Sequence, residues 1–242
     1  MFELTDDDIK LKLLANEPIE IYGIGNLQLP STRQVISMNE SLHNTYLSYL
    51  LFSKENLSET SEEMDKLSDF EILVSFLYHD ASFREVFFNA LELIFGEKPN
   101  YEEGIIFFGL PSEESLFTEE KWDFVKKVLK IGNFIEDKKE EEIIPGNERA
   151  RKFMEKLKRQ KEQAPKVKSK QNLHSMISAI SWKTVGINNV LDLTIYQLYD
   201  AFMRLENIDN YHYTLTGIYT GNIDSKGIKL SDINWANIIK VK

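Results

Sequence analysis

The acidic and basic residues of this chain are segregated into three zones, and this distribution limits which segments can form a packed core. Residues 1–142 hold 13 Lys or Arg against 30 Asp or Glu, a net charge of −17. Residues 143–172 hold 10 against 3, a net charge of +7, and residues 173–242 hold six of each sign. We therefore predict an acidic N-terminal domain, a basic helical connector and a C-terminal helical domain.

The predicted connector has the pattern of an exposed, charged helix. Pro145-Gly146 precedes it and Ala164-Pro165 follows it, and both pairs are typical of helix boundaries. Asn147 is a favourable N-cap for the segment NERARKFMEKLKRQKEQ. Its large apolar residues form a stripe too narrow for a buried core helix: Phe153, Met154 and Leu157.

The N-terminal domain is predicted to be mainly helical, with one small β element. Residues 18–30 alternate apolar and polar positions around two glycines, which predicts a strand or hairpin. Residues 104–111 are either a short buried strand or an apolar loop, because their periodicity does not distinguish the two. Several helix starts carry the capping-box spacing, in which a Ser or Thr precedes an acidic residue by three positions. These pairs are Thr5 with Asp8, Ser68 with Glu71, and Ser82 with Glu85.

The C-terminal domain is predicted to contain two main helices. The first begins near Leu173, and a loop is expected around residues 186–189. The second covers residues 194–208 and opens with a Thr194–Gln197 capping box. Residues 209–242 are expected to fold over these helices. The fold class predicted for the whole chain is mainly α, with a small β element near the N-terminus.

Composition excludes several functional classes. The chain contains no cysteine, which excludes a disulfide framework, a thiolate metal cluster and a cysteine nucleophile. The first ten residues are acidic where a signal peptide would be basic, and no stretch approaches the roughly 18 apolar residues of a membrane span. We therefore expect a cytoplasmic protein that does not contact a membrane.

A search for catalytic motifs gives no candidate. The four histidines are far apart and lack paired-ligand spacing, and the acidic clusters lack the glycine-containing arrangement of a calcium loop. Gly23-Ile24-Gly25 begins like a dinucleotide fingerprint, but residue 28 is Gln, so a turn that needs positive φ is the better interpretation. We predict a non-enzymatic protein with no cofactor and no metal site.

Two segments resemble a known family. The segments Asn147–Lys161 and Leu191–Leu205 are similar to those of the tail assembly chaperones of phages and prophages that infect low-GC Gram-positive bacteria. The resemblance implies an assembly factor that binds the tape measure protein or the tail tube protein until the tail forms. It carries over no catalytic residue. A coiled-coil client would suit recognition of a helix in a groove.

The predicted partner-binding residues lie on the second C-terminal helix and on the connector. On the helix they form an aromatic-rich stripe with an adaptable Met: Tyr196, Tyr199, Phe202 and Met203. Arg151 and Lys158 of the connector complete the set. The alternative interpretation is that Tyr199 and Phe202 belong to the core.

Two other functions stay open at this point. One is a structural virion component of the baseplate, neck or tail. The other is a nucleic-acid-binding regulator that uses residues 149–170, which carry ten positive charges. This segment contains one aromatic residue, so it lacks the interleaved aromatics typical of single-strand binders, and nucleic acid is the less favoured partner. The sequence does not predict the oligomeric state.

Overall fold

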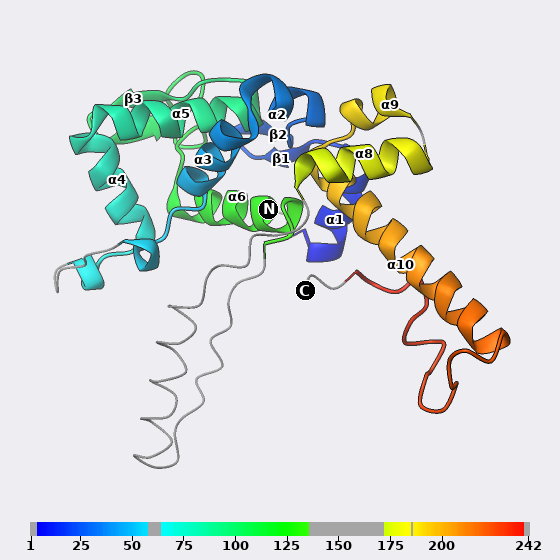
Figure 1. Cartoon of the computed structure of the whole chain (residues 1–242). Coiled ribbons are helices and arrows are strands. Elements are labelled where there is room, and N and C mark those ends of the chain that lie inside the picture. Colours follow the sequence, from blue (N-terminus) through cyan, green and yellow to red (C-terminus); the bar gives the residue numbers. More distant parts are fainter. Residues whose placement is uncertain (1–3, 58–63, 136–171, 185, 240–242) are drawn as a thin grey trace, which may run out of the picture.

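The computed structural model describes residues 4–57, 64–135, 172–184 and 186–239. These residues form a mainly helical fold with a small antiparallel hairpin near the N-terminus, which confirms the predicted fold class (Figure 1). A second small hairpin lies in the middle of the chain. Apart from Asn172, the predicted connector 143–172 lies outside the described residues. Arg151 and Lys158, and the similar segment Asn147–Lys161, therefore lie outside them too.

The chain begins with a capped helix and a hairpin. Helix α1 (Asp6–Ala15) starts at the predicted capping box, in which the Asp8 amide donates to Thr5 Oγ1 and the Thr5 amide donates to the Asp8 carboxylate. Strands β1 (Ile19–Ile21) and β2 (Gly25–Leu27) then pair antiparallel. Of the two predicted alternatives, a strand or a hairpin, the structure has the hairpin. The turn between its strands contains Gly23 at φ +76°, so the predicted positive-φ turn is confirmed.

Four helices follow the first hairpin: α2 (Thr32–Met38), α3 (Glu40–Leu50), α4 (Asp69–His79) and α5 (Ala81–Phe95). Two 3-10 turns, η1 (Lys54–Asn56) and η2 (Met64–Lys66), lie between α3 and α4. The Ser68–Glu71 capping box of α4 is confirmed. The predicted Ser82–Glu85 box of α5 is wrong, because Asp80 Oδ1 occupies the cap and accepts hydrogen bonds from the amides of Ser82 and Phe83.

The second hairpin and α6 complete the N-terminal part. Strand β3 (Asn100–Glu102) pairs with β4 (Ile105–Phe107), so the segment 104–111 contains a short strand. Helix α6 (Glu119–Gly132) begins at Thr118, whose side chain accepts a hydrogen bond from the Lys121 amide. Its fully buried Trp122 donates an indole hydrogen bond of 3.1 Å to the carbonyl oxygen of Leu50, which ties α6 to the end of α3.

The C-terminal part contains three helices, α8 (Leu173–Lys183), α9 (Ile187–Asp192) and α10 (Ile195–Tyr219). The loop expected at residues 186–189 is wrong, because Gly186 at φ +79° turns the chain directly into α9. The Thr194–Gln197 box is confirmed, but α10 continues well beyond Ile208. Its apolar spacing continues over the extra turns, with side chains three, four and three positions apart: Ile208, Tyr211, Leu215 and Ile218.

The buried side chains form two clusters, and helix α10 contributes to both. The larger contains residues of the first hairpin, α1 and α3–α6, and also Tyr196 of α10. The smaller contains residues of α8, α9 and α10, and also Val35 of α2. Each cluster therefore includes a side chain from the opposite end of the sequence.

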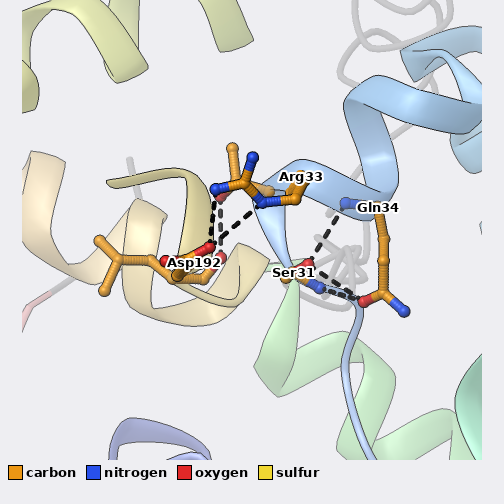
Figure 2. A network of polar contacts seen from close by, with 6 residues as sticks. Ser31, Arg33, Gln34 and Asp192 are labelled. Atoms are coloured by element: carbon orange, nitrogen blue, oxygen red, sulfur yellow. Dashed lines mark hydrogen bonds and ion pairs between the residues drawn. The ribbon is translucent and has the colours of Figure 1, made fainter. Parts of the chain in front are cut away.

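A polar junction fixes α2 against the start of α10 (Figure 2). The amide and hydroxyl of fully buried Thr32 both donate to the carbonyl oxygen of Leu193, at 2.7 and 2.9 Å. The Ile195 amide donates to the carbonyl oxygen of Pro30 at 3.1 Å, and Arg33 pairs with Asp192 at 2.9 Å. Because the N-termini of α2 and α10 are held here, α10 extends from a fixed base along the edge of the molecule (Figure 1).

A candidate binding groove between α1, α6 and α10

A groove of about 470 Å³ lies where α1, the end of α6, α10 and the C-terminal segment meet. Most of its wall is apolar: Leu11, Leu14, Ile131, Phe134, Ile135, Tyr196, Ile238 and Ile239. Charged side chains lie among and around these residues: Asp6, Asp7, Lys10, Lys130, Asp200 and Arg204. The groove therefore combines an apolar floor with charged groups, which suits the binding of an amphipathic segment.

Several apolar side chains of the groove are open to solvent. Leu11 is 65 % exposed, Leu14 is 49 % exposed and Ile135 is 39 % exposed, while Ile238 of the C-terminal segment is 79 % exposed. Helix α1 supplies two of these because it has two apolar faces. Ile9 and Leu13, one helical turn apart, are buried in the core, whereas Leu11 and Leu14 point into the groove.

The end of α6 is shaped by a Schellman motif in which a phenylalanine takes the place usually held by glycine. The Ile135 amide donates to the carbonyl oxygen of Lys130 and the Phe134 amide donates to that of Ile131, at 2.9 and 3.2 Å. Phe134 is therefore held at φ +53°, a conformation that costs an L residue about 1 kcal/mol. In return, the turn directs Phe134 and Ile135 toward α10 and the groove.

Tyr196 forms the wall of the groove on α10. Its ring stacks on Phe134, and it is only 5 % exposed. Burial, reinforced by the nearby Asp200 carboxylate and opposed by Arg204, raises the pKa of Tyr196 to about 12, so the phenol stays neutral to a higher pH than an exposed tyrosine does. One residue further along, the Gln197 side chain donates a hydrogen bond of 2.7 Å to the carbonyl oxygen of Leu14, which holds α1 beside α10.

The C-terminal segment is held at the groove by Arg204. After the end of α10 the chain turns back, with Ile223 packed over Gly217, and runs toward α1 (Figure 1). The Arg204 guanidinium donates to the carbonyl oxygens of Trp235 and Asn237, at 2.7 and 2.8 Å. This double hydrogen bond places Ile238 and Ile239 at the margin of the groove.

The carboxylates of the groove differ in their partners. Asp6 pairs with Lys127 at 2.9 Å, and Asp7 pairs with Lys10 at 3.6 Å. Among the described residues, no hydrogen bond or ion pair engages the half-buried carboxylate of Asp200. Burial raises the pKa of Asp200 above its ordinary value, while the Coulombic attraction of Arg204 acts in the opposite direction.

The four sequence-predicted residues of α10 do not form one exposed stripe. Tyr196 is buried in the groove wall, whereas Tyr199 and Phe202 are half-buried and pack against the smaller cluster. Met203 is half-buried as well. Their role in partner binding stays a prediction, and Tyr196 is the member that lines the groove.

Sequence reasoning missed the other groove residues. Leu11 and Leu14 were visible in the sequence as extra apolar positions in a helix whose core face needed only two large residues. No comparable signal pointed to Asp200, Arg204 or Ile238, because their proximity arises from the return of the C-terminal segment along α10.

The described residues contain no group of three or more histidine, aspartate or glutamate side chains placed to hold a metal ion. None of the helices in the described ranges has both the length and the apolar character that a bilayer crossing requires.

Comparison with known proteins gives one family match. Residues 159–240 match the model of a family described as the YomV second domain, which is associated with phages and prophages. The match includes α8, α9, α10 and the C-terminal segment, so it covers one wall and the margin of the groove. No curated protein and no solved structure matched the chain. The C-terminal part of this chain is thus similar to a phage-associated domain.

Proposed function

We propose that this chain is a non-enzymatic, chaperone-like assembly protein of a phage or prophage tail. In this proposal the groove between α1, α6 and α10 holds an amphipathic helix of the tape measure protein or the tail tube protein until it is incorporated. The observation that carries the proposal is the exposure of large apolar side chains on three sides of the groove, from α1, the end of α6 and the C-terminal segment.

Exposed apolar residues gathered around one depression favour a protein ligand. Single exposed apolar residues are common on soluble proteins, but a contiguous group around a groove is typical of an interaction site. Covering a Leu or Ile side chain fully contributes about 1.5–3 kcal/mol. Because Leu11, Leu14 and Ile135 are already partly covered, an incoming helix would gain a part of this from each, which suits a client that must later be released.

The family match and the resemblance both support this choice among groove-binding functions. The phage-associated match over residues 159–240 includes the side of the groove that α10 forms. The segment Leu191–Leu205, which is similar to tail assembly chaperones, contains Tyr196, Asp200 and Arg204. These three groove residues therefore lie both in the segment that matches the family model and in the segment that resembles tail assembly chaperones.

Co-expression with the tape measure protein of the same phage or prophage tests the proposal. The wild-type chain should co-purify with the client and keep it soluble, and the double variant Leu11→Ser/Leu14→Ser should lose most of this capture. Ile36→Ser is the matched control, because Ile36 is 50 % exposed on α2, away from the groove. Failure to capture the client, or equal capture by the double variant, would contradict the proposal.

The two other functions make different predictions. A structural virion component should be detected by mass spectrometry of purified particles, whereas an assembly chaperone should be absent from them. A nucleic-acid-binding regulator should bind DNA or RNA with a steep dependence on salt concentration. Residues 149–170, which would carry that activity, lie outside the described residues.

A further inference from the structure

The Asp200 carboxylate differs from the other carboxylates of the groove, because no hydrogen bond or ion pair among the described residues engages it. It lies on α10 one turn after Tyr196, at a half-buried position beside apolar side chains. Its oxygens still reach solvent, but partial burial removes some of their hydration, and no donor among the described residues replaces it. The other two carboxylates of the groove, Asp6 and Asp7, each have a lysine partner.

Arg204 does not supply the missing hydrogen bond. Although it lies one turn after Asp200 on the same helix, its guanidinium donates to the carbonyl oxygens of Trp235 and Asn237. Among the described residues, no ion pair within 4 Å joins Arg204 to Asp200. Arg204 therefore stabilises the position of the C-terminal segment and leaves the carboxylate open to a donor from a ligand.

We propose that the groove recognises an amphipathic helix that carries one Lys or Arg at the edge of its apolar face, and that this cation pairs with Asp200. Leu or Ile side chains on the neighbouring turns of the ligand cover Leu11, Leu14 and Ile135. This inference rests on the proposed function of the groove and adds the chemical identity of its ligand. Charge complementarity selects the ligand, and apolar contact supplies most of the affinity.

Arg and Lys suit this position better than a neutral donor does. A charge-assisted hydrogen bond is roughly twice as strong as a neutral one, and the apolar surroundings of Asp200 weaken competition from water. Both side chains also have long apolar stems, which can lie along Leu14 or Tyr196 while the charged group reaches the carboxylate. Asp200 should therefore make the groove bind a basic amphipathic helix more tightly than an equally apolar neutral helix.

Two synthetic peptides of identical composition test the inference. Each has about 18 residues, long enough to be helical on binding, with leucines at helical spacing and a single lysine. In the first peptide the lysine borders the apolar face, and in the second it lies in the middle of the polar face. Binding to the purified full-length chain is measured by fluorescence anisotropy, so that any difference in affinity arises from the lysine position.

The wild-type chain should bind the first peptide about fivefold more tightly than the second. A fivefold difference in affinity corresponds to about 1 kcal/mol, the upper end for a charge pair at a protein surface. Asp200→Asn should remove this preference. A third peptide carries glutamate in place of the lysine that borders the apolar face. Asp200→Lys should bind this third peptide more tightly than the first peptide. Asp209→Asn is the matched control, because Asp209 lies on the same helix outside the groove and pairs with Lys183.

The outcomes separate this inference from the function on which it rests. Equal binding of the first two peptides, or a preference that survives Asp200→Asn, would overturn the inference. Suppose that both peptides bind the wild type equally and that neither binds Leu11→Ser/Leu14→Ser. The groove is then still a helix-binding site, and only the role of Asp200 is rejected. Absence of binding by every peptide would overturn both. Thermal unfolding of each variant shows whether the fold is intact.

Discussion

The ring of Tyr196 lies stacked on the ring of Phe134, with the centroids 5.2 Å apart and the planes inclined by 12°. This contact joins the beginning of α10 to the turn that ends α6. Tyr199 extends it from the next turn of α10, with its ring perpendicular to Phe134 at 6.2 Å. Through this contact Tyr196 packs α10 against the larger cluster and also forms one wall of the groove.

Replacing Tyr196 should destabilise the whole fold as well as the groove. We expect Tyr196→Ala to lower the free energy of unfolding by about 3–5 kcal/mol, because it removes a large buried ring and leaves a cavity. Tyr196→Phe keeps the stacked ring and should cost much less. Tyr213→Ala, at a position of the same helix that is 73 % exposed, is the control and should change stability by less than about 0.5 kcal/mol. Urea unfolding measures all three, and similar costs for Tyr196→Ala and Tyr213→Ala would contradict the prediction.

The junction between α2 and α10 should depend on the hydroxyl of Thr32. Thr32→Val keeps the shape of the side chain but removes the hydrogen bond to the carbonyl oxygen of Leu193. That oxygen still accepts the Thr32 amide, so it is not left without a donor, and the expected loss is about 1 kcal/mol. Thr45→Ala removes an exposed hydroxyl that donates within α3, and should have a smaller effect. Equal denaturation midpoints for Thr32→Val and the wild type would exclude a stabilising role for this bond.

Gly23 is required for the close approach of the first hairpin to the loop before α6. A Cβ at this position would lie 1.8 Å from the carbonyl oxygen of Glu114, and the backbone is at φ +76°. Gly104 has a similar φ of +87° but open space around it, so Gly104→Ala should cost about 1–2 kcal/mol from backbone strain alone. Gly23→Ala should cost clearly more, because the clash adds to the strain. If calorimetric melting shows the two variants to be equally stable, the close approach is not a constraint on residue 23.

Local sequence patterns predicted the helix starts well and the groove poorly. The boxes at Thr5, Ser68 and Thr194 depend on residues three positions apart, so the sequence contained all the information. The α5 start was misassigned because two polar residues, Asp80 and Ser82, lay close enough together to compete for the cap. The groove depends on contacts such as that between Gln197 and Leu14, which are 183 positions apart. Such contacts leave no periodic signal in a single sequence.

Buried His43 should make the stability of the chain depend on pH. His43 lies on α3 at 7 % exposure, and burial lowers the pKa of its imidazole, against a smaller opposing effect of a hydrogen bond with Asn44. The folded state favours the neutral ring. The contribution of His43 to the free energy of unfolding is therefore fully present above the unfolded pKa of about 6.5. As the pH falls below that value the unfolded chain binds a proton first, so this contribution is lost toward the lower, folded pKa. Urea unfolding at pH 7.5 and pH 5.5 should show a decrease for the wild type that is smaller in His43→Gln, and an equal decrease in both proteins would show that another group titrates in this range.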